Sequence, residues 1–190
     1  MIKCVVEVSA RHIHLSQADF VKLFGPTAEL SEKNKLSIKT DFATPYTVTL
    51  VNGDKKLEGV RVIGPFRPRT QIEISLTDAR HMDVEPHIRL SGELSGTPGV
   101  TVSGDFGKTC LREGVIVAQR HLHIGMESAN KLGLRAGMIV NLVVGGERGA
   151  LLKNIMVRLA TVDQPTVHVD TDEANAIGLP AGGSGEILIK

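Results

Sequence analysis

The chain has few aromatic residues and few cysteines. Among its 190 residues are no Trp, one Tyr and five Phe, so few rings are available to stack nucleic-acid bases or to form a sugar-binding surface. Two cysteines, Cys4 and Cys110, cannot build a disulfide framework, and we expect a reducing compartment. The net charge of +1, from 22 Lys and Arg against 21 Asp and Glu, disfavours a nucleic-acid or anionic-membrane partner bound through bulk charge.

Long apolar runs are absent too. No stretch approaches the roughly 18 apolar residues of a membrane-spanning helix. Residues 1–8 predict a strand rather than a signal peptide, because they lack a charged start, a long apolar centre and a cleavage site. Hydrophobic residues still make up 42% of the chain, which is enough to form a core. We therefore expect a cytoplasmic protein with one large domain or two small ones.

Short runs of β-branched and apolar residues predict a mostly β fold. These runs are bounded by Gly, Pro or Asn-Asp, and they lie at 2–8, 46–51, 60–63, 71–76, 100–103, 115–118, 138–144, 155–160 and 165–169. Asn52-Gly53-Asp54 separates two runs and is typical of a hairpin turn. Helix signals are fewer and lie at 16–24, 77–82, 126–132 and 171–177. Many short strands with few helices favour a barrel-like architecture with capping helices.

Glycine-rich stretches leave the domain boundary open. Between residues 92 and 107 the glycines mark either a boundary between two halves or a series of tight turns within one domain. Residues 182–185 predict a turn near the C-terminus rather than a phosphate-binding loop. The sequence contains no phosphate-loop, dinucleotide-fold or serine-elbow motif. Cys4 lies in an apolar run and Cys110 has no His nearby in the sequence, so neither is a persuasive nucleophile.

The chain repeats a short histidine motif. Residues 11–14, Arg-His-Ile-His, recur as Arg-His-Leu-His at residues 120–123, and each copy follows an apolar run and precedes a helix signal. Inside the C-terminal half, residues 123–134 align with residues 168–179, with His, Ala-Asn and Gly-Leu in register. A strand–histidine–helix unit thus occurs in three places.

These histidines are candidate metal ligands. Residues i and i+2 of an extended segment point to one face with their Cα atoms about 6.5 Å apart, close enough for two rings to bind one ion. Imidazole suits zinc and other late first-row metals. A lone His-X-His favours surface or satisfied core histidines, but the repetition favours ligands: His12 with His14, His121 with His123, and His168 as the equivalent third site. His81 and His87 lie outside the repeats, and we interpret them as surface residues.

A carboxylate and an arginine loop complete the candidate residues. Alternation in residues 71–75 places Glu73 on the face opposite two isoleucines, and carboxylate commonly complements imidazole at zinc. A solvated strand face is the alternative. Just upstream, Arg67 and Arg69 lie in a proline-stiffened loop, where guanidinium groups can clamp an oxyanion such as phosphate. Composition alone favours a solvated loop there.

Four segments together resemble a known enzyme family. In order along the chain they cover nearly its whole length, and they are Val-Ser-Ala-Arg-His-Ile-His-Leu-Ser (8–16), Gly-Pro-Phe-Arg-Pro-Arg-Thr-Gln-Ile-Glu-Ile-Ser (64–75), Arg-His-Leu-His-Ile (120–124) and Val-His-Val (167–169). They resemble the PduL-type phosphate propanoyltransferases, phosphotransacylases associated with bacterial microcompartments. The resemblance implies two small β-barrel domains with short capping helices and the active site between them. Residues 11–118 would form the first, and residues 119–190 with the N-terminal strand 1–10 the second.

The same resemblance implies a reaction and its residues. A short acyl group, propanoyl or acetyl, would move between coenzyme A and inorganic phosphate to give an acyl phosphate. Two metal ions, usually zinc, would be held by His12, His14, Glu73, His121, His123 and His168. Arg67 would bind phosphate and act in catalysis, and coenzyme A would contact Val8, Ser9, Ala10, Arg61 and Asn175.

The residues also suggest how the reaction proceeds. No side-chain nucleophile is evident, so we expect direct attack of a phosphate oxygen on the thioester, with positioning and charge neutralisation as the enzyme's task. A two-metal thioester or phosphoester hydrolase and a non-enzymatic metal-binding module are the alternatives.

Location and assembly are predicted less directly. Microcompartment members of the family often carry an amphipathic N-terminal extension, whereas this chain begins at its first strand. We therefore expect a cytoplasmic enzyme and leave microcompartment association open. Small barrels with exposed edges often dimerise, which leaves a homo-oligomer open as well.

Overall fold

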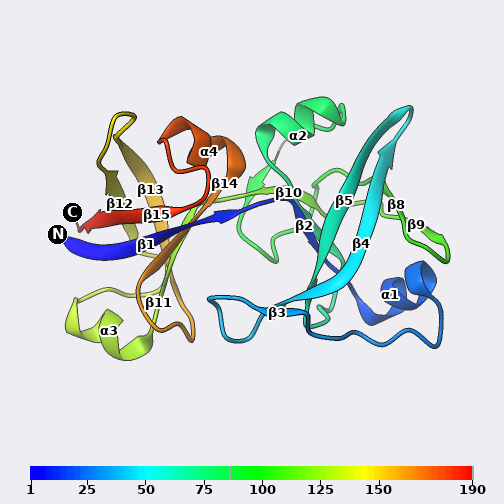
Figure 1. The fold of residues 1–190 in the computed structure, drawn as a ribbon, viewed down its shortest axis with the longest axis horizontal. Coiled ribbons are helices and arrows are strands. Elements are labelled where there is room, and N and C mark those ends of the chain that lie inside the picture. The colour runs from blue at the N-terminus through cyan, green and yellow to red at the C-terminus, as the bar shows by residue number, and fades with distance from the viewer. Residues whose placement is uncertain (86, 190) are drawn as a thin grey trace. The chain divides into compact units, whose positions relative to one another are not determined.

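The computed structural model describes residues 1–85 and 87–189, and it is mostly β, as the sequence predicts (Figure 1). In the described part of the chain, fifteen strands are accompanied by four short helices. The chain divides into two compact units. The barrel unit comprises Met1–Ser9, Ser37–Lys39 and Gln119–Lys190, and the sheet unit comprises Ala10–Leu36 and Thr40–Ala118.

The barrel unit is a closed six-stranded barrel. Its strands follow the order β1-β14-β11-β13-β12-β15, and β15 pairs with β1 to close the ring. Apolar side chains fill its interior, among them Val6, Leu122 and Ile155, none of which is exposed to solvent. The elements of this unit are β1 (Ile2–Ser9), β11 (His121–Ile124), α3 (Met126–Lys131), β12 (Ile139–Val144), β13 (Ala150–Leu159), β14 (Thr166–Asp170), α4 (Thr171–Ala176) and β15 (Gly183–Leu188).

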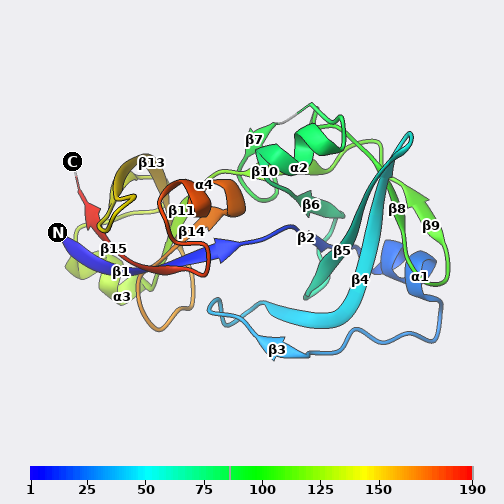
Figure 2. The same ribbon diagram turned by 45° about the horizontal axis from the view of Figure 1, so that its top comes forward.

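The sheet unit is a nine-stranded sheet that curls into a half-barrel. Figure 2 shows its strands in the order β7-β10-β6-β2-β5-β4-β8-β9, with β3 pairing on β4. Four of the few aromatic rings pack together in this unit: Phe20 is part of its core, and Phe24, Tyr46 and Phe66 pack against the core. Its elements are β2 (His12–His14), α1 (Gln17–Phe24), β3 (Asn34–Lys35), β4 (Phe42–Asn52), β5 (Lys55–Gly64), β6 (Gln71–Glu73), α2 (Leu76–His81), β7 (Ile88–Arg89), β8 (Thr101–Ser103), β9 (Lys108–Cys110) and β10 (Val115–Ala118).

Both units contain the same succession of strand pairings. In the barrel unit, β1-β14-β11-β13-β12-β15 pair as parallel, antiparallel, parallel, antiparallel and antiparallel. In the sheet unit, β10-β6-β2-β5-β4-β8 repeat that succession. The first strands are exchanged along the chain, since β1 precedes β2 but pairs with β14, whereas β10 precedes β11 but pairs with β6. The sheet does not close as the barrel does, because β8 pairs with β9 where β15 pairs with β1.

The predicted helices and the hairpin are confirmed. Ser16 caps α1 by accepting a hydrogen bond from the Asp19 amide, and Gly25 ends the helix with a φ of 94°. The other three helices lie within one residue of their predicted starts. β4 and β5 meet at the predicted turn, where Gly53 has a φ of 57°.

Two local predictions are wrong. The strand predicted over 71–76 ends at Glu73, because the Ser75 side chain accepts a hydrogen bond from the Asp78 amide and so begins α2. The turn predicted over 182–185 is a strand from Gly183, which pairs with β1. Gly185 fits this position because a Cβ there would lie 2.6 Å from Leu142 Cδ1.

The glycine-rich stretch at 92–107 lies inside the sheet unit and forms turns. Gly92 and Gly96 have positive φ angles, and Gly99 packs so closely that a Cβ would lie 2.0 Å from the Leu111 carbonyl oxygen. The last passage of the chain from the sheet unit to the barrel unit lies after Ala118 instead. Over residues 1–85 and 87–189, no helix combines the length and apolarity needed to cross a membrane.

Candidate functional site

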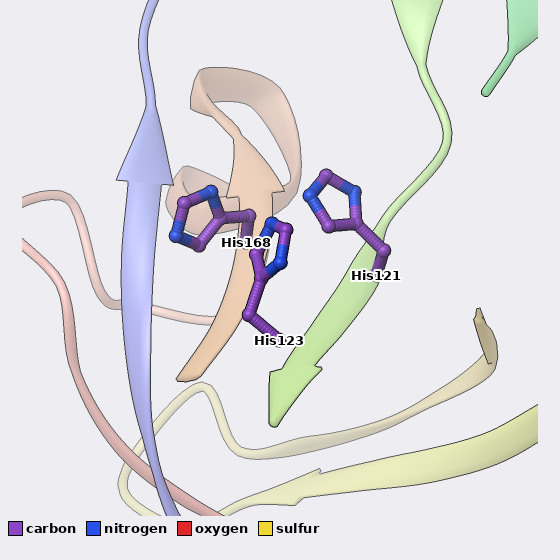
Figure 3. Close-up of side chains that lie close together, drawn as sticks. All are labelled: His121, His123 and His168. Carbon is purple, nitrogen blue, oxygen red and sulfur yellow. The ribbon is translucent and has the colours of Figure 1, made fainter. Parts of the chain in front are cut away.

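Three histidines converge on adjacent strands of the barrel unit (Figure 3). His121 and His123 lie two residues apart on β11, and His168 on β14 is the antiparallel cross-strand partner of His121. Their ring centroids are 4.6 to 5.4 Å apart. One ligand atom from each ring lies within 4.8 Å of the others. The second copy of the motif and His168 therefore form one cluster, which we call the three-histidine set.

The sheet unit contains the matching cluster. His12 and His14 lie two residues apart on β2, and Glu73 on β6 is the antiparallel cross-strand partner of His12. The two ring centroids are 5.1 Å apart, and His12 Nε2 lies 3.6 Å from Glu73 Oε2. Ligand atoms of all three residues again lie within 4.8 Å of one another. In this set, which we call the glutamate set, Glu73 takes the place that His168 has in the other.

The first histidine of each set is oriented in the same way. His12 Nδ1 lies 2.8 Å from the Ala10 carbonyl oxygen, and His121 Nδ1 lies 2.8 Å from the Gln119 carbonyl oxygen. A carbonyl oxygen only accepts hydrogen bonds, so Nδ1 carries the proton in both rings. Nε2 is then the nitrogen with a lone pair for a metal ion. No sequence pattern indicates these two carbonyls.

Several nitrogens of the two sets are buried without a hydrogen bond. His14 Nδ1 and both ring nitrogens of His123 are in this position. Buried polar atoms are normally paired, and a metal ion would provide the missing partner. Two ligands of a tetrahedral zinc lie roughly 3.3–3.5 Å apart, close to the observed distance between His12 and Glu73. Both sets thus offer donors and spacings that fit a divalent ion such as zinc.

Protonation favours metal binding as well. Burial, reinforced by the neighbouring His12, lowers the pKa of His14 to about 4. Burial, reinforced by His121 and His168, lowers the pKa of His123 to about 2. Both rings are therefore neutral near pH 7, the state in which imidazole binds a metal.

Buried hydrogen bonds hold Glu73 in place. Gln71 Nε2 donates to Glu73 Oε1 at 2.6 Å and also contacts Ser91 Oγ at 2.8 Å. The Gly92 amide donates to Gln71 Oε1 at 2.7 Å. Because Oε1 accepts from Gln71, Oε2 is the oxygen that faces His12. Gln71 and Glu73 share a face because residues i and i+2 of a strand point the same way, but this alternation alone gives Gln71 no role.

A second carboxylate lies beside the three-histidine set. Glu7 on β1 is the cross-strand neighbour of His168, and its Oε2 lies 3.2 Å from His168 Nε2. That nitrogen is buried and makes no hydrogen bond of good geometry. Ser37 Oγ donates to the same carboxylate oxygen at 2.6 Å. The contacts with His168 and Ser37 lower the pKa of Glu7, although burial opposes this. No sequence pattern had indicated Glu7.

Comparison with known proteins identifies the family. The family model for phosphate propanoyltransferase matches residues 5–180. The chain belongs to this family. The resemblance seen in its motifs is confirmed, and with it the enzyme class, an acyltransferase.

Curated relatives give the same answer. A phosphate propanoyltransferase of Rhodopseudomonas palustris is 45% identical over 174 residues, which cover 92% of this chain and 77% of the relative. Enzymes of the same name from Thermotoga maritima and Salmonella typhimurium are 41% and 42% identical. The Thermotoga match covers 94% of this chain and 85% of the relative, and the Salmonella match covers 90% of this chain and 81% of the relative.

Arg67 of this phosphate propanoyltransferase family member lies in the sheet unit. Its Nη2 lies 2.9 Å from Asp41 Oδ2, and its Nε is buried without a hydrogen bond. Its charge acts on His14, which places it near the glutamate set. The neighbouring Arg69 is ion-paired with Glu113 instead. Arg67 thus has an unpaired buried N–H beside the candidate metal ligands.

The positions implied for coenzyme A are placed as follows. Arg61 on β5 is the parallel cross-strand neighbour of His12, and it donates to the Thr44 and Pro45 carbonyls. Asn175 is exposed on α4. The other three residues end β1 or follow it: Val8, Ser9 and Ala10. Their contact with coenzyme A remains a prediction.

The other candidate side chains lie outside the two sets. His81 Nε2 contacts the Lys56 carbonyl, and His87 Nδ1 contacts the Glu85 carbonyl. Cys4 is buried, and burial raises the pKa of its thiol to about 11. A thiol with that pKa is a poor nucleophile near pH 7.

Proposed function

We propose that the chain moves a short acyl group, propanoyl or acetyl, between coenzyme A and inorganic phosphate, and that two divalent ions, zinc by preference, serve this reaction. Family membership supports the acyl transfer. One observation carries the proposal of two ions: two equivalent three-residue sets, each containing histidine nitrogens that are buried without hydrogen bonds. The glutamate set would hold one ion and the three-histidine set the other.

The proposed reaction is a direct displacement. A phosphate oxygen attacks the thioester carbonyl carbon, the new C–O bond forms, and the C–S bond breaks with release of the coenzyme A thiolate. Direct attack agrees with the state of Cys4, whose buried thiol is unsuited to form a covalent intermediate. A thioester is already activated, so the protein mainly positions the reactants and neutralises charge.

Charge neutralisation is the task of the proposed site. A divalent ion in each set would supply Lewis acidity toward phosphate and the thioester carbonyl. Arg67 would add a fixed positive charge, and Asp41 would orient its guanidinium through the 2.9 Å contact. The Ala10 and Gln119 carbonyls would fix the tautomers of His12 and His121. Coenzyme A is proposed to contact the positions named from the resemblance, among them Arg61 beside His12.

Release of free thiol from propanoyl-CoA tests this function. The purified chain is assayed with and without phosphate, before and after chelation, and with acetyl-CoA in parallel. We expect release that requires phosphate, stops on chelation and returns when zinc is added. Release without phosphate would instead indicate a thioester hydrolase. Metal-loaded protein that releases no thiol would indicate a metal-binding module.

A further inference from the structure

The two sets differ in where their negative charge lies. The glutamate set contains a carboxylate among its three residues, Glu73. The three-histidine set consists of imidazoles alone, and neutral rings leave the full +2 charge of a bound ion uncompensated. A buried charge is stabilised when an opposite charge lies nearby. A carboxylate is therefore expected close to the three-histidine set.

Glu7 provides that carboxylate. It faces His168 across the parallel β1–β14 pair, with its Oε2 3.2 Å from His168 Nε2. Ser37 Oγ donates to the same oxygen at 2.6 Å and so fixes the carboxylate. Figure 3 shows the His168 ring extending toward β1, on the side away from His121 and His123.

Glu7 lies behind His168 rather than among the ligands. The residues whose ligand atoms lie within 4.8 Å of one another are the three histidines, and Glu7 is not one of them. A carboxylate in this position is a common outer partner of a metal-binding histidine, where it fixes the ring and its tautomer.

The duplicated strand pairing gives an internal comparison. Glu7 lies beside His168 on β1, and the corresponding position of the sheet unit is Ile116, which lies beside Glu73 on β10. Ile116 is fully buried and apolar. Of these two equivalent positions, only the one beside the three-histidine set carries a carboxylate.

We propose that Glu7 is a positioning residue for the three-histidine set. Its carboxylate holds the His168 ring with Nε2–H directed toward Oε2, leaves Nδ1 for the ion, and balances part of the ion's charge. This inference rests on the metal binding put forward under the proposed function. It predicts that His168 binds through Nδ1, whereas His12 and His121 bind through Nε2.

Zinc competition against a chromophoric chelator tests the inference on the full chain. The variants are Glu7→Gln, which keeps the shape and removes the charge, and Glu7→Ile, which places the residue of the equivalent position there. Substitution of a residue that hydrogen-bonds to a metal ligand typically weakens metal affinity by about 10- to 100-fold. We expect that loss for one of the two zinc ions in Glu7→Ile and a smaller loss in Glu7→Gln. The second ion should be unaffected. The metal-free variants should remain folded with at most a small decrease in melting temperature, because they lose the partly exposed contacts of Glu7 with His168 and Ser37.

A spectroscopic measurement separates positioning from a structural role. The ¹⁵N shifts of the imidazoles in the zinc-loaded wild type should show His168 bound through Nδ1, and Glu7→Ile should lose this preference. The side chain of Glu7 is 40% exposed, so both variants are expected to fold. Ser37→Ala gives a second variant, in which the carboxylate stays but is no longer fixed, and the affinity should fall less.

Each outcome has a distinct meaning. Unchanged affinities in folded Glu7→Ile and Ser37→Ala, or His168 bound through Nε2 in the wild type, would overturn the role of Glu7 and leave the proposed function intact. A wild-type chain that binds no zinc would overturn the metal binding of the proposed function, and the role of Glu7 with it.

Discussion

Arg120 Nη1 lies 3.0 Å from Glu173 Oε1 and joins the start of β11 to the first turn of α4. Arg11 makes the equivalent contact with Asp78 in the first turn of α2, also at 3.0 Å. In each unit, the arginine before the two histidines therefore pairs with the helix that follows the strand of the third candidate ligand. The arginine of the repeated motif thus links the histidine strand to that helix through an ion pair.

Loss of the Arg120–Glu173 ion pair should destabilise the barrel unit. Arg120→Ala leaves Glu173, which is mostly buried, without its cation, and we expect a loss of about 1 kcal/mol in the free energy of unfolding. Urea denaturation measures this loss. Lys131→Ala is the matched control, because its pair with Glu127 is exposed and should contribute little. Equal effects of the two substitutions would contradict the role of Arg120.

Asp19 should make stability depend on pH. Burial raises the pKa of Asp19, but hydrogen bonds from Thr70, Lys22 and Ser16 outweigh burial, and the net shift is downward. A carboxyl group with a lowered pKa stabilises the folded state above its unfolded pKa, and this contribution is lost as pH falls through its folded pKa.

Asp19→Asn tests this pH dependence. It should lower the free energy of unfolding by about 1–3 kcal/mol near pH 7, because several hydrogen bonds to a charged group weaken. The difference from wild type should shrink as pH falls below about 4. Urea denaturation of both proteins near pH 7 and below pH 4 measures this difference in the free energy of unfolding. A difference that stays constant down to pH 2.5 would be inconsistent with the proposed role of Asp19.

Gln71→Leu should weaken metal binding by the glutamate set. Gln71 Nε2 donates a 2.6 Å hydrogen bond to Glu73 Oε1, and an apolar side chain would remove this bond. We expect the affinity for one zinc ion to fall by about 10- to 100-fold. Chelator competition measures the loss. Ser91→Ala keeps the hydrogen bond to Glu73 and should have a smaller effect, so equal losses in the two variants would argue against this role for Gln71.

Arg67→Ala should impair turnover without loss of metal. Removal of one preorganised positive charge typically lowers the rate by about 10²–10³-fold. Arg69→Ala is the matched control. Arg69 lies in the same loop as Arg67 but is ion-paired with Glu113, so its removal should have little effect on turnover. Thiol-release rates and zinc content measure both effects. Near-wild-type turnover of folded Arg67→Ala would remove Arg67 from the proposed site.

The parts of the site that the sequence predicts are those set by local pattern. His12 and His14 share a face because a strand has a period of two, and Glu73 could be found from the same alternation. The repeat identified His168 by its spacing from Ala174 and Gly178. Caps and turns were also readable, because Ser16 and Gly25 act on neighbouring backbone groups.

The parts that could not be predicted depend on strand register. Glu7 meets His168 because β1 pairs with β14, and no local pattern links residues so far apart in the chain. The contacts that orient Gln71 toward Glu73 likewise depend on how the loop at Ser91 and Gly92 folds back on Gln71. The strand from Gly183 was predicted as a turn because glycine clusters are typical of turns. In the structure these glycines instead allow close packing, since a Cβ at Gly185 would lie 2.6 Å from Leu142 Cδ1.

The most direct test of the central claim is the turnover of Glu73→Ala and His168→Ala, measured together with their zinc content. If both sets serve one acyl transfer, each variant should retain one zinc ion per chain and release thiol from propanoyl-CoA at least about 10²-fold more slowly than wild type. Circular dichroism should show both variants folded. A folded variant with one zinc ion and near-wild-type, phosphate-dependent release would contradict the claim that both sets are required.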